Sequence, residues 1–217
     1  MALYLRQLPL GPMKNFVYLV GPEHGTEALV VDPAWDVGAI LGAAAEDGRT
    51  LVGAFVSHCH HDHINGLPDL LAAQDLPVYA QREELAFSPE LQRVKDAVVP
   101  LSPGGTVAVG SARFRALHTP GHTPGSQCLH AGDALVSGDT LFVNGCGRCD
   151  LKGSDPAAMY RSISQVLLQL PRQTVLFPGH DYGDVPVSSL EREDAHNPFF
   201  QFADVESFVR FRMTPRR

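Results

Sequence analysis

Residues 57–63, Ser-His-Cys-His-His-Asp-His, decide the interpretation of this chain. They directly follow an apolar, β-rich run, so we expect them to begin where a buried strand ends. In an extended or tightly turned segment, positions i and i+2 project to one side, and His58 and His60 can therefore share one metal ion. Asp62 and His63 come as the chain turns into a helix and can face a neighbouring point. Imidazole and carboxylate suit zinc, iron and manganese, so the stretch predicts a metal site.

Three later residues extend this candidate ligand set. His122 lies in Thr-Pro-Gly-His-Thr-Pro-Gly (119–125), where Pro and Gly fix the backbone and leave the imidazole free to point inward. Asp139 follows an apolar strand and Gly138, and His180 follows a strand and Gly179. All three share one arrangement of strand end, glycine and ligand. Within the first cluster, His61 is expected to face solvent or a supporting partner, and Cys59 to be a small buried thiol.

The composition bounds the class of protein. The chain has 217 residues, 44% of them apolar and 19% charged, which predicts one globular domain spanning residues 1–217. A formal net charge of −7 argues against a nucleic-acid partner. Arg6 and Gln7 interrupt any signal-peptide core, and no apolar run approaches the roughly 18 residues of a membrane span. Four cysteines are too few for a disulfide scaffold. Together these features lead us to expect a cytoplasmic protein without membrane contact.

The order of expected elements predicts two sheets packed together with helices outside. Apolar runs bounded by Gly and Pro predict the strands, and Asp36 and Gly48 predict the start and the stop of a helix. The expected strands are 3–8, 15–20, 28–32, 51–56 and 174–177, with short strands over 106–143; the expected helices are 36–47, 155–169 and 186–195, with a helix–strand unit over 64–80.

The sequence resembles the metallo-β-lactamase superfamily, in particular its glyoxalase II-like and persulfide dioxygenase-like branch. The resemblance implies an α/β fold, the four-layer αββα sandwich, with a metal site at one edge of the paired sheets. The motifs that carry it span most of the chain: Ser-His-Cys-His-His-Asp-His (57–63), Thr-Pro-Gly-His-Thr-Pro-Gly (119–125), Ser-Gly-Asp-Thr-Leu-Phe (137–142), Gly-Cys-Gly-Arg-Cys-Asp (145–150) and Pro-Gly-His-Asp-Tyr (178–182).

The same resemblance implies how the ligands are divided between two divalent metal ions, for which zinc is expected first and iron or manganese are alternatives. Asp62 and Asp139 are also the expected catalytic carboxylates. One ion would be held by His58, His60 and His122, and the second by Asp62, His63 and His180, with Asp139 bridging them.

Two reactions fit these motifs. In the first, a metal-bound hydroxide hydrolyses a thioester such as S-(2-hydroxyacyl)glutathione, as glyoxalase II-like members do. In the second, a single iron bound by His58, His122 and Asp139 oxidises glutathione persulfide to sulfite. Lactam hydrolysis and a non-enzymatic binding role fit less well, because the ligand set is complete and the remaining motifs are those of the thiol-conjugate branch.

The expected substrate is a small molecule, and the residues that would bind it are less specific. Arg148 either grips a glutathione carboxylate or forms a surface salt bridge, and Tyr182 matches a tyrosine that contacts glutathione in relatives. No separate helical C-terminal domain of the longer glyoxalase II enzymes is expected, which leaves a broader acyl substrate open. A homodimer also remains open. Cys146 and Cys149 are read as structural. Ordinary loop or core roles are expected for the other histidines, His24, His118, His130 and His196.

Overall fold

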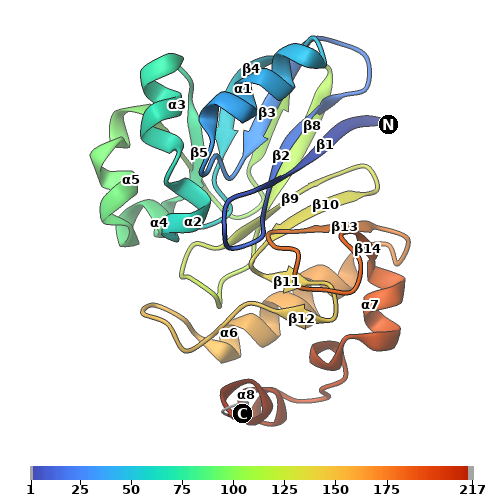
Figure 1. Cartoon of the computed structure of the whole chain (residues 1–217). Coiled ribbons are helices and arrows are strands. Elements are labelled where there is room, and N and C mark those ends of the chain that lie inside the picture. Colours follow the sequence, from blue (N-terminus) through green and yellow to red (C-terminus); the bar gives the residue numbers. More distant parts are fainter. Residues whose placement is uncertain (1, 215–217) are drawn as a thin grey trace.

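Two six-stranded sheets lie at the centre of the computed structural model, which describes residues 2–214 (Figure 1). A small ribbon of β11 (Leu141–Phe142) and β12 (Gly145–Cys146) lies beside them. The first sheet has the order β1 (Leu3–Leu10), β2 (Asn15–Pro22), β3 (Glu27–Val31), β4 (Thr50–Phe55), β5 (Val78–Gln81) and β6 (Val98–Leu101). The second has the order β14 (Ser188–Ser189), β13 (Val175–Pro178), β10 (Ala134–Gly138), β9 (Gln127–Ala131), β8 (Ala112–His118) and β7 (Thr106–Val109).

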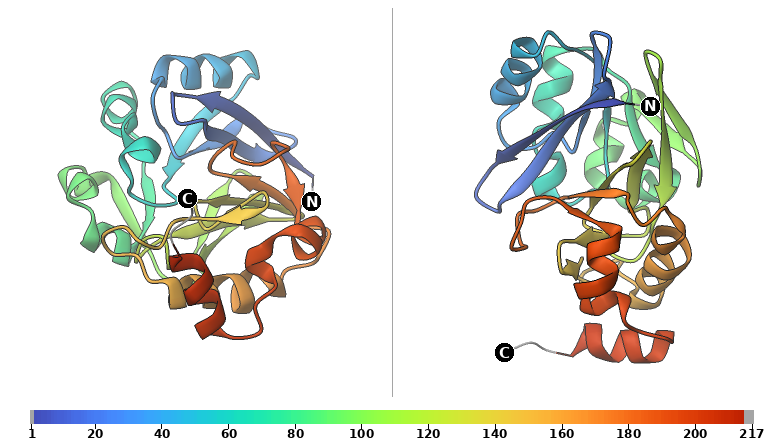
Figure 2. Two further views of the ribbon diagram at one scale, coloured as in Figure 1. Left: turned by 60° about the horizontal axis from the view of Figure 1, so that its bottom comes forward. Right: turned by 90° about the vertical axis from the view of Figure 1, so that its right-hand side faces the viewer.

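Helices cover the outer face of each sheet, so the predicted αββα sandwich is confirmed (Figure 2). Every helix of the described residues is too short or too polar to span a lipid bilayer. The first sheet is covered by α1 (Val37–Glu46), α2 (His61–Ile64), α3 (Leu67–Ala73), α4 (Arg82–Phe87) and α5 (Pro89–Arg93). The other side carries α6 (Pro156–Arg161) and α7 (Leu190–His196), and α8 (Val205–Met213) packs on α6.

Strand β2 shows why the two sheets pack as they do. All of its residues are buried. Because successive side chains of a strand point to opposite faces, Phe16, Tyr18 and Val20 enter the core between the sheets. Val17 and Leu19 enter the core beneath the helices. An uninterrupted apolar run is thus the pattern of a strand buried on both faces.

The N-terminal half follows the sequence expectations closely. Helix α1 begins after Asp36, whose carboxylate accepts a hydrogen bond from the N–H of Ala39 at 2.8 Å. Short elements between β5 and β7 were not expected. Helices α4 and α5 are only 6 and 5 residues long, Ser88 separates them and Pro89 begins α5, so neither shows a helical period.

The C-terminal half is helical where a helix was expected over 155–169, but it differs from the expectations in two details. The helix expected over 155–169 is regular only to Arg161 and continues as a π-helical turn (Ser162–Val166) and a 3-10 turn (Leu167–Gln169). The helix expected over 186–195 begins at Leu190, because Ser188 and Ser189 first pair with β13. Helix α8 follows it and was not expected.

Parallel strand pairs bring the candidate ligands to one edge. β3 runs parallel to β4, and β10 runs parallel to β13. The carboxyl ends of parallel neighbours meet at the same edge of a sheet, so residues that follow them lie close together. Asp32 follows β3, residues 57–63 follow β4, Asp139 follows β10 and His180 follows β13.

Candidate metal centre

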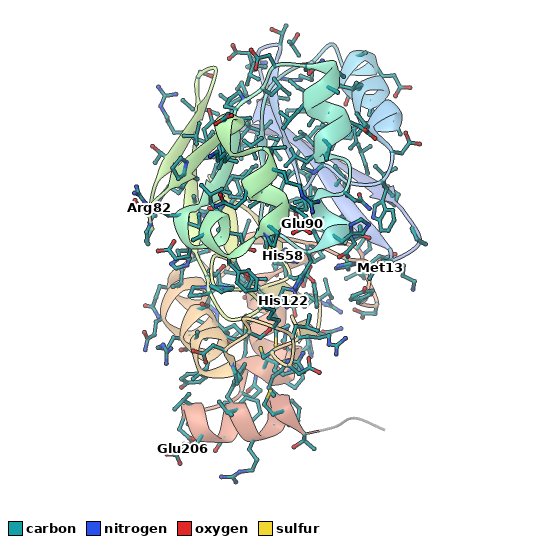
Figure 3. All side chains as sticks on the ribbon, turned by 90° about the vertical axis from the view of Figure 1, so that its left-hand side faces the viewer. Met13, His58, Arg82, Glu90, His122 and Glu206 are labelled. Carbon is teal, nitrogen blue, oxygen red and sulfur yellow. The ribbon has the colours of Figure 1, made fainter. Side chains whose placement is uncertain are left out.

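Three histidines from distant loops form the first group of donors. His58 and His60 come from the segment after β4, and His122 comes from the loop between β8 and β9. Their donor atoms all lie within 4.8 Å of one another. Figure 3 shows His58 and His122 near one another at the edge of the sandwich, with ring centroids 4.8 Å apart. The structure thus brings together the three residues expected to share one ion.

Asp62, His63 and His180 form the second group, again with donor atoms within 4.8 Å. The Nε2 atoms of His63 and His180 are 3.1 Å apart, and Asp62 Oδ2 is 3.4 Å from His180 Nε2. Two nitrogen ligands of a tetrahedral zinc, each about 2.0–2.1 Å from the metal, lie about 3.3 Å apart. The spacing of these donors therefore fits one small divalent ion.

Asp139 lies between the two groups and faces both. Its Oδ2 is 3.5 Å from His122 Nε2, and its Oδ1 is 3.3 Å from His63 Nε2. The approach depends on glycine, since a Cβ at Gly179 would lie 2.6 Å from Asp139 Oδ1. Gly138, which precedes the aspartate, adopts φ +51° and leaves no room for a Cβ beside Ser57.

The polar atoms turned into this space fit a cation. Within residues 2–214, His58 Nε2, His122 Nε2 and Asp139 Oδ1 are buried without a hydrogen-bond partner. A buried polar atom without a partner is costly unless something satisfies it. Two imidazole lone pairs and a carboxylate oxygen are donors that a divalent cation would satisfy.

Fixed backbone carbonyls decide which nitrogen of two histidines faces the centre. His122 Nδ1 donates to the carbonyl oxygen of Arg148 at 2.8 Å, and His180 Nδ1 donates to that of Met13 at 2.9 Å. Because Nδ1 carries the proton, Nε2 presents its lone pair to the centre. Both histidines are thereby set in the tautomer that binds metal through Nε2.

The histidines of the centre differ in the direction in which their pKa values are shifted. Burial holds the pKa of His58 well below its ordinary value and lowers the pKa of His60 to about 4, so both imidazoles are neutral and available as ligands. Burial also acts against a charge on His63, but the carboxylates of Asp139 and Asp32 outweigh it and hold its pKa well above the ordinary value. A proton at His63 in the metal-free protein would therefore compete with a metal.

Asp32 supports the centre and was missed as a functional residue in the sequence. Its Oδ2 accepts from Ser57 Oγ at 2.6 Å and from His63 Nδ1 at 2.9 Å. Since the Ser57 hydroxyl proton is used there, its oxygen accepts from His58 Nδ1 at 3.0 Å. One carboxylate thus orients a histidine of each group. The available signal was an acidic residue at the end of an apolar strand, as at Asp139 but without the glycine that precedes Asp139.

Glu84, on α4, was also missed and is fully buried. One carboxylate oxygen accepts from the N–H of Cys59 at 2.7 Å. The other accepts from Thr123 Oγ1 and from the N–H of Gly125, each at 2.8 Å. The side chain therefore joins the loop that carries His58 and His60 to the loop that carries His122. No local pattern around Glu84 announced this role.

Asn15 supports the second group from strand β2. Its Nδ2 donates to Asp62 Oδ2 at 2.9 Å, and its Oδ1 accepts from the Trp35 indole N–H at 3.0 Å. The Asn15 amide is therefore oriented from one side by Trp35 and in turn orients the Asp62 carboxylate. This pair was not singled out in the sequence, because its members lie in different elements.

The two expected substrate residues lie near the centre but differ in availability. The guanidinium of Arg148 is exposed and makes a bidentate pair with Asp150 at 2.9 and 3.0 Å, which is the surface salt bridge considered above. Tyr182 is 53% exposed and stacks on His180, with ring centroids 4.5 Å apart. Tyr182 therefore stands at the mouth of the centre.

The remaining cysteines and histidines lie outside both donor groups. Cys59, Cys128 and Cys149 are buried free thiols, and Cys146 is also buried. His61 is exposed, in agreement with the expectation that it faces solvent. Its ring lies edge-on to that of Trp35, with centroids 6.3 Å apart. The other histidines show varied surroundings: His24 and His196 are exposed, His118 contacts the carbonyl of Pro124, and His130 is half-buried.

Comparison with known proteins agrees with this geometry. Residues 10–180 match the model of the metallo-β-lactamase superfamily. The chain belongs to this superfamily. Among metallo-β-lactamase superfamily proteins, one relative is the probable polyketide biosynthesis zinc-dependent hydrolase BaeB of Bacillus velezensis, 32% identical over 91% of this chain and 87% of that protein. The hydroxyacylglutathione hydrolase of Gloeobacter violaceus is 37% identical over 77% of this chain and 64% of that enzyme.

Solved structures of superfamily members extend the comparison. ETHE1 from Myxococcus xanthus has a TM-score of 0.86 and 31% identity, covering 99% of this chain and 92% of that one. TTHA1623 in a di-iron-bound form has a TM-score of 0.77 and 32% identity, covering 89% and 99% of the two chains. These likenesses place the chain in the glyoxalase II-like and ETHE1-like branch of the superfamily of metallo-hydrolases. The fold binds divalent metals, and the His/Asp cluster is compatible with them.

Proposed function

We propose that this protein is a metal-dependent hydrolase of thioesters, with S-(2-hydroxyacyl)glutathione as the first substrate to test. One observation carries the proposal. The carboxylate of Asp139 lies between the two groups of possible metal ligands and faces both. Two adjacent divalent ions are typical of hydrolytic centres. The likeness to a hydroxyacylglutathione hydrolase and to a zinc-dependent hydrolase supports it, and zinc is the metal we propose first.

The chemistry needs an activated water and a polarised carbonyl. Bound in the two groups, divalent ions would supply a water of lowered pKa and a Lewis acid for the thioester oxygen. His58, His60 and His122 contribute neutral donors on one side. On the other, Asn15 fixes the Asp62 carboxylate beside His180. The water oxygen forms the new C–O bond, the C–S bond breaks, and the water proton ends on the leaving thiolate.

A second candidate is the persulfide dioxygenase reaction that the same motifs fit. It would use only His58, His122 and Asp139, two histidines and a carboxylate, which is the donor set of a mononuclear iron site. In the structure, Asp139 Oδ2 is 3.5 Å from His122 Nε2, and the rings of His58 and His122 are 4.8 Å apart. The side chains of these three residues therefore lie close enough together to hold one ion.

One pair of measurements separates the two reactions. Zinc-loaded protein is given S-lactoylglutathione and thiol release is followed; iron-loaded protein is given glutathione persulfide and oxygen uptake is followed. Thiol release above a metal-free control, without oxygen uptake, supports the hydrolase. Rapid oxygen uptake with stoichiometric sulfite moves the protein to the dioxygenases. The measured reaction, and not the metal found after expression, decides between them.

We also propose a cytoplasmic location and a small-molecule substrate. Cys59, Cys128 and Cys149 are free thiols, which is typical of a reducing compartment. Contacts of Arg148 and Tyr182 with glutathione remain part of the proposal. Arg148 would have to exchange its Asp150 partner for a substrate carboxylate.

A further inference from the structure

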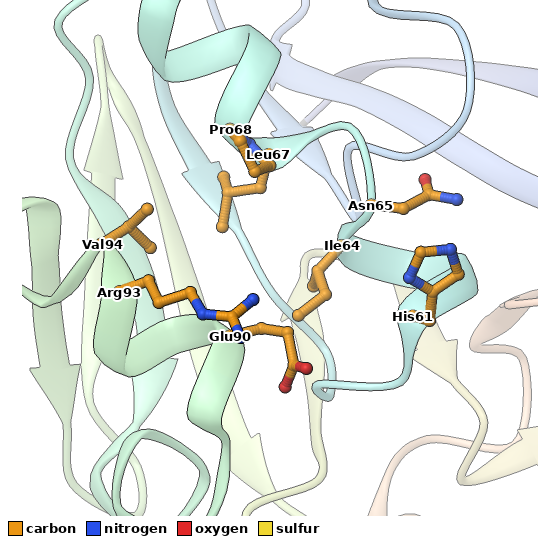
Figure 4. Close-up of a pocket in the computed structure, with 8 residues that line it drawn as sticks. All are labelled: His61, Ile64, Asn65, Leu67, Pro68, Glu90, Arg93 and Val94. Atoms are coloured by element: carbon orange, nitrogen blue, oxygen red, sulfur yellow. The ribbon is translucent and has the colours of Figure 1, made fainter.

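We propose that the substrate carries an extended apolar acyl group, and that a cavity between α2, α3 and α5 receives it. The proposal rests on the thioester hydrolase function above and names the acyl class that the function leaves open. The space, here called the α2–α5 cavity, is shown in Figure 4. Nothing in the motifs of the chain predicted it.

The cavity is connected to the candidate metal centre. A cleft of about 410 Å³ borders His60 and is lined on its far side by Phe87, Pro89 and Leu151. His61 and Glu90 line both this cleft and the α2–α5 cavity. These two side chains stand between the two spaces, and we infer that an acyl group whose carbonyl lies near His60 reaches the cavity past them.

The walls of the cavity select the chemistry of the group inside it. Most of the surface that the cavity exposes is apolar, and Ile64, Leu67, Pro68 and Val94 lie along it. The polar side chains that also line it are His61, Asn65, Glu90 and Arg93. A charged peptide such as glutathione would lose hydration against the apolar walls, and only the polar side chains among the lining residues could pair with it. An alkyl chain gains free energy in proportion to the apolar area it buries. The cavity therefore suits the acyl arm and not the thiol arm.

The size of the cavity exceeds what a lactoyl group needs. Its volume is about 320 Å³, within the range of small-molecule sites. A volume of about 30 Å³ per water-sized group gives room for roughly ten such groups. A three-carbon hydroxyacyl group would leave most of this space filled with water. A chain of about eight to ten carbons would fill it.

The kinetic test uses zinc-loaded protein and a series of N-acetylcysteamine thioesters: acetyl, lactoyl, butyryl, hexanoyl and octanoyl. We expect kcat/KM to rise about two- to fourfold for each methylene that enters the cavity, up to the chain length that fills it. Equal rates for all members, or a preference for lactoyl, would overturn the inference and leave the hydrolase function standing. Hydrolysis of none of the series, with S-lactoylglutathione still cleaved, would overturn the inference alone. Hydrolysis of neither would overturn the proposed function.

Variants at the wall test the location. Val94 is half-buried and lines the cavity, and Val99 on β6 is 42% exposed and lies outside it. We expect Val94→Phe to lower kcat/KM for the octanoyl substrate at least tenfold with the acetyl substrate unchanged, and Val94→Ala to move the optimum to longer chains. Val99→Phe should change neither. The location is contradicted if Val94→Phe lowers kcat/KM equally for short and long chains and Val94→Ala leaves the optimal chain length unchanged.

A binding measurement decides on the cavity independently of turnover. The non-hydrolysable thioether S-octyl-N-acetylcysteamine is titrated into metal-free protein, and the methyl NMR signals are followed. Saturable shifts of the Ile64, Leu67 and Val94 methyls, larger than those of Val99, support the cavity. The cavity assignment is overturned if the NMR shifts are confined to other residues. It is also overturned if the thioether does not saturate a protein that hydrolyses the octanoyl thioester.

Discussion

The Glu84 carboxylate accepts a hydrogen bond from the backbone N–H of Cys59 at 2.7 Å, and this contact lies between two candidate metal ligands in the sequence. Its other oxygen binds the loop of His122. The relative position of the three histidines in the first group therefore depends on a residue that binds no metal itself. A fully buried carboxylate is stable there because both of its oxygens accept hydrogen bonds.

Replacing Glu84 should loosen the first donor group. In Glu84→Gln an N–H₂ replaces one acceptor oxygen and faces other donors, so we expect metal affinity to fall about 10- to 100-fold and the free energy of unfolding to fall by about 2–4 kcal/mol. Chelator competition and urea unfolding measure the two effects. Glu83→Gln, an exposed neighbour on the same helix, is the control. Unchanged affinity in Glu84→Gln would show that the two loops hold their geometry without it.

Asp32 offers a substitution that isolates hydrogen bonding from backbone strain. Its φ is +54°, a region that asparagine adopts readily, so Asp32→Asn should fold. The amide has one acceptor oxygen where the carboxylate has two, so its N–H₂ must face either the Ser57 backbone N–H or the Ser57 hydroxyl and His63 Nδ1. We expect divalent-metal affinity to fall about 10- to 100-fold. Calorimetric titration with zinc measures it. Asp36→Asn, at a helix N-cap outside the centre, should bind zinc normally.

Asp139→Asn should weaken both metals together, because the carboxylate faces both donor groups. We expect zinc content to fall from two equivalents towards none after dialysis against a weak chelator. Asp133→Asn, an exposed turn residue in the loop before β10, serves as the control. Loss of a single equivalent in Asp139→Asn would instead assign this carboxylate to one ion.

Stability should decline at high pH through two buried thiols. Burial raises the pKa of Cys128 and that of Cys149, each to about 11. The unfolded chain loses these protons at lower pH than the native protein, so the free energy of unfolding is unaffected below about pH 8 and falls as pH rises from about 9 to 11. The expected loss is about 2 kcal/mol per thiol at pH 11. Urea unfolding from pH 8 to 11 measures it, and Cys128→Ala should flatten the decline; an identical slope would contradict this cause.

The metal chemistry could be recognised from short sequence motifs because it is local. His58, His60, Asp62 and His63 lie within six residues, and the strand before them delivers them to one place. The apolar runs of β2 and β3 likewise predict buried strands from composition alone. The candidate ligands and two packed sheets with helices outside therefore follow from residue type and spacing, whereas the αββα class was implied by the resemblance that the motifs carry.

Only the tertiary structure decided what surrounds those ligands. Glu84 and Asp32 each act on a residue 25 positions away, and the α2–α5 cavity forms between helices that have no period of their own. Such contacts depend on how separate strands and helices pack, and no spacing within one segment encodes them. The sequence by itself determined which atoms could bind metal. The packing of the two layers determined which tautomers they adopt, how they are held, and what space a substrate would find beside them.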